Sequence, residues 1–472
     1  MAVENNLHNK GDIFYLTIIC LSSSLGGFLF GFDTAVASGT IGFLREQFHL
    51  NPAMEGWIMS AALYGSVIGA AFAGVLSDRF GRRRILILSA FLFMVSAVGC
   101  TLPETTKLLI FARLIGGVGV GIAAMVAPIF VSEISPPHLR GRMVSLYQFA
   151  ITFGILSSYL SNTLLLSLSQ HYSGAGDGFI QIVFVHEVWR GMFGSEIIPA
   201  ALFLVLLMIV PESPRWLTKM GREKDAEMIL KRVLGEAEMQ KEMIEIRDMT
   251  SQKKGSVFEL LQPGLRTALL IGIMLPVFNQ LTGITTVMYY APTIFERAGF
   301  QSASAFGSAA VIGFVNMIFT IVAIWKIDHF GRKPLLLVGF GALIIALGGI
   351  GWVFSRQTGI ESSTILMVLF IFYIMFFAAS LGPGVWVVPS EIYPTHIRGR
   401  GMSISTLTLF AGSSIVTQTF PLLREGIGMG NTFYIYGIMM IPALLFTWRV
   451  IPETKGKTLE EIQKYWLSRK RT

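Results

Sequence analysis

Residues 26–39 read GGFLFGFDTAVASG and place one acid, Asp33, inside a long apolar run that begins near Ile13. A carboxylate at the depth of the hydrocarbon core is costly, so such a side chain normally faces a wet cavity or a cationic partner. The alternative is that the helix ends earlier and Asp33 caps a loop. Because apolar residues resume at Ala35 and continue toward the first loop charge, Arg45, we favour a helix that carries Asp33 inside the membrane.

The composition is that of a polytopic membrane protein. Hydrophobic residues make up 53% of the 472 residues, charged residues only 14%, and the mean hydropathy is +0.63, well outside the usual range of soluble domains. Apolar runs of about 20 residues, the length that spans a bilayer, occur about twelve times. The predicted spans are residues 13–37, 54–77, 85–101, 108–130, 143–167, 190–210, 265–290, 306–327, 335–354, 363–388, 402–422 and 431–450.

The basic residues indicate membrane topology rather than nucleic-acid binding. The formal charge is +8 and the sequence pI is 9.4, but the bases lie in short loops at helix ends and not on one amphipathic face or in a tail. The positive-inside rule makes the basic side the cytoplasm and places both termini there. The clusters on that side are Arg79, Arg82, Arg83 and Arg84; Arg140 and Arg142; Arg332 and Lys333; and Arg398 and Arg400. Opposite loops hold isolated bases such as Arg45, Arg297 and Arg424.

Neither the cysteines nor the amino-terminal segment changes this topology. Cys20 and Cys100 both fall within predicted spans, so they indicate neither a disulfide framework nor a metal site, and we expect packing roles. The segment before Ile13 is short and polar, and no small-residue cleavage site follows an apolar core. The first helix is therefore expected to be retained.

Two pairs of motifs reveal an internal duplication. Residues 132–142 read SEISPPHLRGR and residues 390–400 read SEIYPTHIRGR, which are identical at eight of eleven positions. Residues 78–83, DRFGRR, similarly match residues 328–333, DHFGRK. Both copies of each motif lie on the basic side and each half holds six spans. The halves therefore share one orientation and are related by an axis along the membrane normal.

The duplication predicts an all-α membrane protein with twelve transmembrane helices in two six-helix bundles and short cytoplasmic helices between the halves. The expected parts are an N-terminal bundle at residues 1–210, a cytoplasmic helical linker at 211–264, a C-terminal bundle at 265–452 and a cytoplasmic tail at 453–472. In the linker, Ala226, Ile229 and Leu230 have the spacing of one helix face. We expect this apolar stripe to pack against the ends of the bundle, since the segment is too small for a core of its own.

The repeated cytoplasmic motifs carry charges that can hold helix ends together. We expect Glu133 to lie near Arg140 and Glu391 near Arg398, with the arginines of the DxFGR turns reaching the partner half. Such charges can latch the cytoplasmic ends in one conformation and be hydrated in the other. The alternative is that they only fix topology, and the two roles are compatible. The predicted gate residues are Arg79, Arg83, Glu133, Arg142, Glu212, Arg215, Arg332, Glu391 and Arg400.

Motifs along nearly the whole chain carry a family resemblance. They are GRR after the second span, RLIGGVGVG at residue 113, SEISPPHLRGR, PESPRW at residue 211, FNQLTGITTVMYYAP at residue 278, DHFGRK, GPGVWVVPSE at residue 382 and PETKGKTLEE at residue 452. Together they resemble the sugar porter family of the major facilitator superfamily, and most closely the bacterial proton-coupled sugar symporters of the xylose type. The resemblance implies two six-helix bundles around a central site that opens alternately to each side.

By motif matching, the resemblance also implies where a sugar would bind. The predicted substrate-binding residues are Phe30, Gln148, Asn279, Gln280, Thr285, Tyr289, Asn316, Gly382 and Trp386. The chain departs from the family pattern, which usually has two glutamines at positions 279 and 280, an asparagine at Thr285, a glutamine at Ile155 and a tryptophan at Phe410. These departures leave the identity of the sugar open.

The amides in this set suit an uncharged ligand with many hydroxyl groups. Amides both donate and accept hydrogen bonds, and an aromatic face such as that of Trp386 covers the C–H surface of a sugar ring. Each amide could instead tie helices together, at about 0.6 kcal/mol apiece. The neighbouring Gly283 interruption favours binding, because unwound backbone is tolerated in a membrane where it lines a cavity. Tyr289 and Tyr290 are either gate residues or part of an interfacial aromatic belt.

Asp33 needs a cationic partner, and Arg113 lies early in the otherwise apolar fourth span. Pairing would offset part of the desolvation cost of both groups, and protonation of Asp33 would release Arg113. We therefore predict a proton switch, to which Glu196 of the sixth span can belong. The resemblance agrees, because an acid at this position accompanies proton-coupled members of the family whereas facilitators tend to have a neutral residue. A structural ion pair without coupling is the alternative.

The sequence predicts a transporter and not an enzyme. The run GGVGVG at residue 116 lies in an apolar helix without a preceding strand, so it indicates close helix packing rather than a dinucleotide site, and no catalytic motif, cofactor or metal site is expected. We predict uptake of a monosaccharide, either a pentose or a hexose, or of a cyclic polyol by proton symport, in a monomer that spans the cell membrane and binds no nucleic acid. The alternatives are a uniporter, a non-transporting sugar sensor and an exporter of amphipathic drugs.

Overall fold

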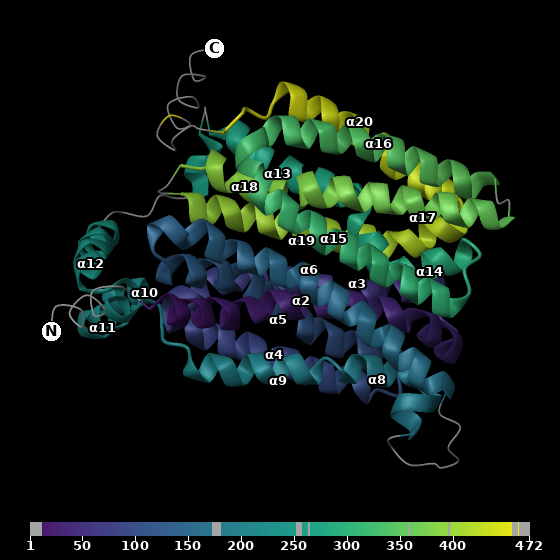
Figure 1. The fold of residues 1–472 in the computed structure, drawn as a ribbon, viewed down its shortest axis with the longest axis horizontal. Coiled ribbons are helices and arrows are strands. Elements are labelled where there is room, and N and C mark those ends of the chain that lie inside the picture. Colours follow the sequence, from purple (N-terminus) through teal and green to yellow (C-terminus); the bar gives the residue numbers. More distant parts are fainter. Residues whose placement is uncertain are drawn as a thin grey trace.

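The structure is a computed structural model that describes residues 12–171, 181–251, 257–262, 265–356, 359–394, 397–455 and 461. Within these residues the chain is helical and contains no strand. Figure 1 shows the N-terminal helices (purple and blue) and the C-terminal helices (green and yellow) as two neighbouring bundles of long, roughly parallel helices. Much of the proposed tail and the first eleven residues lie outside the described residues.

The first bundle holds six membrane-crossing segments. They are α2 (Ile13–Phe48), α3 (Pro52–Phe80), α4 (Arg82–Thr101), α5 (Thr106–Ile134), α6 (Pro137–His171) and the pair α8 (Val188–Gly194) and α9 (Ile197–Ile209), which the π-helical turn η1 (Ile182–His186) precedes. Helix α5 packs on α3 and α4, while α2 packs on α6. Helix α2 therefore runs unbroken through Asp33, and the prediction that places this acid within a helix is confirmed over the loop alternative.

The second bundle repeats this order. Its segments are α13 (Arg266–Leu281) with α14 (Ile284–Arg297), α15 (Ser302–Phe330), α16 (Arg332–Arg356), α17 (Gly359–Phe376) with η3 (Phe377–Leu381) and α18 (Gly382–Ile392), α19 (Arg398–Gly426) and α20 (Met429–Arg449). Eleven described segments are long and apolar enough to cross a membrane. The remaining predicted span, residues 402–422, is α19, which is 29 residues long and rich in serine and threonine, and which packs on both α3 and α13.

Short helices connect the bundles, as the linker composition predicts. They are α10 (Pro214–Lys219), α11 (Glu223–Leu234), α12 (Glu236–Ser251) and the 3₁₀ turn η2 (Val257–Leu261). Figure 1 places α10, α11 and α12 together at one end of the bundles. Ala226 and Leu230 are buried and Ile229 is half-buried, so the apolar stripe of α11 does pack inward. This end also carries the basic motifs, so it is the end that the positive-inside rule predicts to be cytoplasmic.

Small residues let helices of the first bundle approach closely. A Cβ atom at Gly117 of α5 would overlap the carbonyl group of Ala62 in α3, and one at Gly121 would overlap that of Ser66. Close backbone contact of this kind is the usual role of glycine in membrane helices. The helix-packing interpretation of the GGVGVG run is therefore confirmed. Cys20 and Cys100 are buried free thiols.

Candidate functional site

A cavity lies where the two bundles meet and encloses about 820 Å³, including the solvent at its mouth. Its walls come from α2, α3 and α6 of the first bundle and from α13, α14, α15, η3, α18 and α19 of the second. The structure brings together all nine residues predicted to bind substrate: Phe30, Gln148, Asn279, Gln280, Thr285, Tyr289, Asn316, Gly382 and Trp386. Four further hydroxyl groups, which the sequence did not single out, belong to Thr34, Thr152, Thr320 and Ser413.

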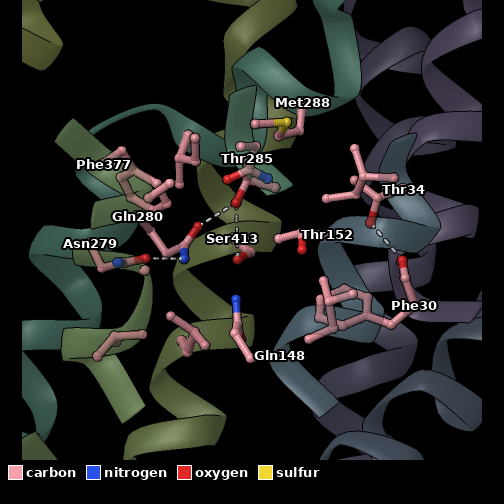
Figure 2. Close-up of a pocket in the computed structure, with 18 of the residues that line it drawn as sticks. Phe30, Thr34, Gln148, Thr152, Asn279, Gln280, Thr285, Met288, Phe377 and Ser413 are labelled. Carbon is pink, nitrogen blue, oxygen red and sulfur yellow. Dashed lines mark hydrogen bonds between the residues drawn. The ribbon is translucent and has the colours of Figure 1, made fainter. Parts of the chain in front are cut away.

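A chain of hydrogen bonds fixes the polar wall of the second bundle (Figure 2). Asn279 donates to the carbonyl oxygen of Leu381 at 3.2 Å and accepts from the Gln280 amide at 2.9 Å. The hydroxyl of Thr285 donates to Gln280 Oε1 at 2.5 Å and lies 3.5 Å from the Ser413 hydroxyl. Each amide is thereby held in one orientation before any ligand arrives, which lowers the ordering cost of binding. The second N–H group of the Gln280 amide makes none of these hydrogen bonds.

The interruption between α13 and α14 creates this wall. Gly283 has a φ of +80°, and a Cβ atom there would overlap the ring of Tyr436. The carbonyl oxygen of Thr282 accepts from the Tyr373 hydroxyl at 2.9 Å. The Thr282 hydroxyl donates to the carbonyl oxygen of Asn279 at 2.6 Å. Side chains thus satisfy the backbone groups that the break frees, as the membrane interior requires.

Three further polar groups face the cavity and have no protein partner among the described residues. They are the side-chain amides of Gln148 and Asn316 and the indole N–H of Trp386. Figure 2 shows Gln148 reaching from the first bundle toward Ser413. Polar groups in such a cavity need a ligand or water to complete their hydrogen bonds. The arrangement therefore suits a ligand that offers several hydroxyl groups.

The wall contributed by the first bundle is mainly apolar. Phe30, Leu63, Ile151 and Ile155 form most of it, and the Phe30 ring meets the ring of Phe410 edge-on at 5.8 Å across the boundary between the bundles. Among the described residues that line the cavity, no side chain is charged. A charged ligand would lack a counter-ion there, so the cavity favours a neutral one.

Asp33 and Arg113 lie together beside this cavity and do not line it. The Nη1 atom of Arg113 on α5 lies 3.3 Å from Asp33 Oδ1, and Nη2 lies 3.5 Å from Oδ2. Only 5% of Asp33 and none of Arg113 is exposed. Arg113 also donates to the carbonyl oxygen of Ile58 at 2.9 Å and lies 5.6 Å from the Phe193 ring centre. The guanidinium thus keeps partners of its own if the carboxylate is neutralised.

Glu196 lies at the break between α8 and α9 and is also buried, with 2% exposed. It is close enough to interact electrostatically with Asp33 and Arg113, but its side chain makes no hydrogen bond or ion pair among the described residues. The three predicted residues therefore gather in one buried region of the first bundle. The pair Asp33 and Arg113 is the direct contact.

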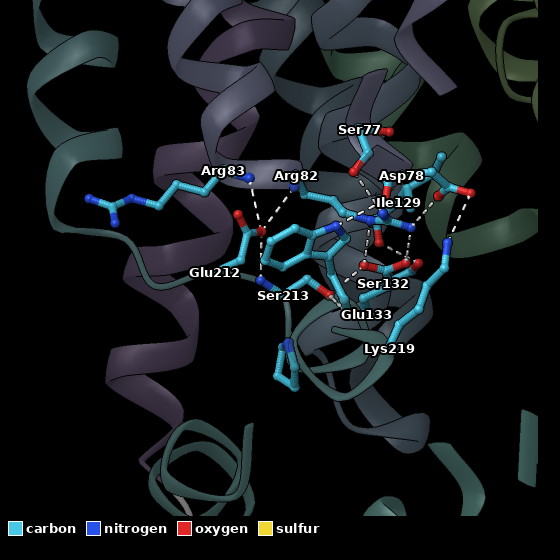
Figure 3. Close-up of polar contacts among 12 residues, drawn as sticks. Ser77, Asp78, Arg82, Arg83, Ile129, Ser132, Glu133, Glu212, Ser213 and Lys219 are labelled. Atoms are coloured by element: carbon cyan, nitrogen blue, oxygen red, sulfur yellow. Dashed lines mark hydrogen bonds and ion pairs between the residues drawn. The ribbon is translucent and has the colours of Figure 1, made fainter. Parts of the chain in front are cut away.

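At the end that carries the basic motifs, the first bundle is held by an ion pair that the sequence interpretation did not foresee (Figure 3). Arg82 binds both oxygens of Glu133, with its Nε atom 3.0 Å from Oε2 and Nη2 3.1 Å from Oε1. Glu212 accepts from the backbone N–H groups of Arg82 and Arg83 at 2.9 and 3.0 Å, and of Ser213 at 2.8 Å. Glu212 therefore caps the start of α4, where a carboxylate is favourable.

The second bundle repeats this geometry. Arg332 binds Glu391 with Nη2 2.8 Å from Oε1, and the N–H groups of Arg332 and Lys333 donate to Glu453 at 3.1 Å. Burial raises the pKa of Glu453, but the N–H groups of Lys455, Arg332, Lys333 and Thr454 outweigh it and hold this pKa below its ordinary value. The duplication in the sequence therefore extends to matching contacts.

In the first copy of the SE…RGR motif, Arg140 contacts the residue before Glu133 but forms no ion pair with Glu133 among the described residues. Glu133 pairs with Arg82, whereas Arg140 donates to the carbonyl oxygen of Ser132 at 3.0 Å and lies 3.6 Å from Glu242 of α12. In this structure Arg82 and Arg332 each bind a glutamate of their own half, so a latch between the halves, which was expected in one conformation of the cycle, stays a prediction.

The other predicted gate residues lie at the same end with different contacts. Arg79 lies over the Phe80 ring at 5.2 Å, Arg83 donates to the carbonyl oxygen of Leu207 at 3.0 Å, and Arg215 lies 3.2 Å from Glu242. Arg142 and Arg400 are exposed. Arg82 and Glu453 were missed, although the duplication could have found them as the counterparts of Arg332 and Glu212.

Of the two tyrosines weighed as gate or belt residues, Tyr289 lines the cavity. Tyr290 is fully buried, and its hydroxyl donates to the carbonyl oxygen of Thr417 in α19 at 3.4 Å. Its backbone departs from helical angles at a kink in α14. Burial of both side chains is incompatible with an aromatic belt at the membrane surface.

Known proteins share both the sequence and the fold. Residues 19–466 match the family model described as sugar (and other) transporter. The arabinose-proton symporter of Bacillus subtilis is 38% identical over 463 residues, which cover 98% of this chain and 96% of that protein. The D-xylose-proton symporter of Escherichia coli K12 is 37% identical over 494 residues, with 98% and 97% covered.

Solved structures give the same result. The inward-open xylose transporter of Escherichia coli matches with a TM-score of 0.81 and 35% identity, over 96% of this chain and 100% of that one. The major facilitator superfamily proton:xylose symporter bound to 6-bromo-6-deoxy-D-glucose matches with a TM-score of 0.78 and 36% identity, over 96% and 100%. The chain therefore belongs to the sugar (and other) transporter family and has the fold of the major facilitator superfamily.

Proposed function

We propose that this protein takes up a neutral monosaccharide, either a pentose or a hexose, or a cyclic polyol, together with a proton. The observation that carries the proposal is the buried pair of Asp33 and Arg113 beside an uncharged, amide-lined cavity. The relatives named as arabinose- and xylose-proton symporters support the same pairing of cargo and proton. The amides receive the hydroxyl groups, and Trp386 covers the ring.

Helix α2 connects the proton site with the substrate site. Asp33 faces Arg113, while Phe30 and Thr34 of the same helix line the cavity. Protonation of Asp33 removes the charge that pairs with Arg113, so the cost of moving α2 past α5 falls. Loss of the proton restores the pair. The carboxyl group thereby decides when the helix that touches the cargo is free to move.

The cycle that follows is alternating access. The bundles at residues 1–210 and 265–452 act as two bodies that rock about the cavity, and the linker at 211–264 joins them on the cytoplasmic side. Cargo and proton bind from outside and leave to the cytoplasm. The protein acts as a monomer in the cell membrane, multi-pass, with both termini in the cytoplasm. It is not an enzyme, and it needs no cofactor and no nucleic acid.

The Asp33→Asn variant tests this function in proteoliposomes. The amide keeps the shape of the carboxyl group but cannot carry its charge. We expect exchange of labelled sugar across the membrane to persist, while uphill accumulation driven by a proton gradient is lost. Accumulation at the level of the unaltered protein would remove Asp33 from the mechanism.

A facilitative uniporter is the second candidate, and the surroundings of the Asp33–Arg113 pair favour it. Arg113 also donates to the Ile58 carbonyl oxygen, and Asp33 does not line the cavity, as expected of a purely structural pair. A uniporter would equilibrate sugar and never concentrate it. Competition of labelled uptake by pentoses, hexoses and inositols then identifies the cargo under either mechanism.

A further inference from the structure

A second set of buried charges joins the two bundles at the end opposite α10, α11 and α12, and the proposed cycle has not used it. Glu55 of α3 accepts from Arg424 of α19 through both oxygens, each at 3.1 Å. The same carboxylate accepts from Nε and Nη2 of Arg45 in α2 at 3.1 and 3.0 Å. The side chains of Glu55 and Arg424 are 1% and 2% exposed.

The set extends to the rim of this end. Arg424 also pairs with Glu425 at 3.1 Å, and Glu425 pairs with Arg297 of α14 at 2.6 Å. Glu425 and Arg297 are each 42% exposed, and both belong to the second bundle. Only the buried contact between Glu55 and Arg424 crosses from one bundle to the other in this set.

Close packing surrounds the crossing ion pair. One residue after Glu55, a Cβ atom at Gly56 would overlap the backbone of Gln418 in α19. Two turns further along α3, the Tyr64 hydroxyl binds the side chain of the same Gln418. Between α6 and α14, the Tyr159 hydroxyl donates to the carbonyl oxygen of Met288 at 2.7 Å. The bundles are thus in contact on the outer side of the cavity.

The crossing pair must break whenever these outer ends separate. Charges buried together are stabilised chiefly by each other, and a separated partner must be hydrated again or remain buried at a high cost. The cytoplasmic pairs differ, because Arg82 with Glu133 and Arg332 with Glu391 each join helices of one bundle. Those contacts can survive a rocking motion unchanged, whereas the pair between Glu55 and Arg424 cannot.

We propose that Glu55, held by Arg45 and paired with Arg424, is an outer latch that sets how often the site opens to the outside. These are positioning residues of the transport cycle, since none of the three lines the cavity. The latch biases the unloaded protein toward the state closed on the outside. Loosening it shifts the population toward the state that accepts cargo from outside.

Ser60 provides a reporter for this equilibrium. It is fully buried and lies one helical turn from both Gly56 and Tyr64, on the face of α3 that meets α19. In a Ser60→Cys variant, a membrane-impermeant thiol reagent added from outside reaches the sulfur only when the outer ends part. Cys20 and Cys100 are buried, and the protein without the Ser60→Cys change measures their background.

The test adds Glu55→Gln together with Arg424→Gln to the reporter variant. We expect labelling from outside to become about tenfold faster, the change that a shift of ~1.4 kcal/mol in the opening equilibrium gives. The matched control is Arg297→Gln, which removes an exposed pair within one bundle and should change the rate little, because exposed pairs contribute little. The assay needs no sugar, so its result does not depend on the proposed cargo.

Two results would overturn the latch. One is an unchanged labelling rate in the double variant, and the other is an equal acceleration in the Arg297→Gln control. If the double variant does not insert into the membrane, Glu55→Asp replaces it, because it keeps the charge and shortens the side chain by one methylene group. That variant should accelerate labelling to a smaller degree, and no acceleration would again contradict the latch.

Discussion

Gln280 is a polar side chain of the cavity whose orientation is fixed by its neighbours. It is locked by Asn279 and Thr285, yet it still presents an N–H group to the cavity. We expect Gln280→Ala to raise the KM for sugar about three- to tenfold, because a lost neutral hydrogen bond costs ~0.5–1.5 kcal/mol. Uptake kinetics measure this, with Gln301→Ala as the control because Gln301 is exposed and does not line the cavity. An unchanged KM would exclude Gln280 from the binding site.

Ile155 gives the cavity an apolar surface. A glutamine at this position could instead bind an additional hydroxyl group of the ligand. The Ile155 side chain lines the cavity beside Ile151, and neither can bind a hydroxyl group. We expect Ile155→Gln to shift the preference between D-galactose and 6-deoxy-D-galactose toward D-galactose by about three- to tenfold, the value of one hydrogen bond. The two sugars differ by one hydroxyl group, so competition against labelled cargo isolates that group. An unchanged ratio would show that Ile155 does not face this part of the sugar.

Motif matching predicted the amides that line the cavity, and their residue type supports a binding role because amides are unusual in a membrane. Amides such as Gln148 and Asn316 stand out against apolar neighbours, and the structure places both in the cavity. The added hydroxyls of Thr152 and Ser413 were not predictable in this way, since serine and threonine are common in membrane helices and satisfy themselves on the preceding turn. Their orientation becomes visible only when the helices are assembled.

At the level of elements, the break at Gly283 makes the polar wall possible. A methyl group there would strain the left-handed backbone and overlap the Tyr436 ring. We expect Gly283→Ala to lower the free energy of unfolding by about 1–3 kcal/mol and to reduce transport. Thermal unfolding in detergent measures the first effect. Gly307→Ala is the matched control, because a Cβ atom at Gly307 of α15 meets open space. An equal loss of stability and transport in both variants would contradict the role of the break.

Glu453 caps the start of α16, and the stability that this cap gives to the fold depends on pH. Its pKa in the folded protein is depressed, so the carboxylate stabilises the fold above its ordinary pKa of 4.5 and this contribution is lost as the pH falls through the folded value. Glu453→Gln should therefore be less stable than the unaltered protein at pH 7, with a difference that shrinks below about pH 4.5. Unfolding midpoints at several pH values test this. The exposed Glu104→Gln provides the control, and a difference that is constant with pH would contradict the assignment.

Helix positions followed from the sequence more closely than helix partners did. Span lengths and the Gly283 break are local properties, set by apolar runs and by backbone conformation. The pairing of Arg82 with Glu133 depends on how α4 meets α5, which no local pattern encodes. The duplication carried information about partners, because Arg332 with Glu391 repeats the same contact.

For the whole molecule, the duplication predicted two bundles of one orientation but not how they meet. The crossing pair of Glu55 and Arg424 joins residues 369 positions apart, and neither has a counterpart that the repeat would reveal. Such contacts belong to one state of a cycle and not to the fold as such. The two-bundle architecture is common to all conformations of the transport cycle, so the sequence predicts it. The closed outer end belongs to one conformation only, and no sequence pattern predicts which conformation a structure shows.

The proposed function depends on the coupling of sugar entry to proton entry, and one recording tests this coupling directly. Proteoliposomes with the protein are placed in weakly buffered medium, sugar is added outside, and external pH is followed for the unaltered protein and for Asp33→Asn. We expect a sugar-dependent rise in external pH with the unaltered protein and none with the Asp33→Asn variant, although both exchange sugar. Sugar entry without any pH change in the unaltered protein would contradict the coupling.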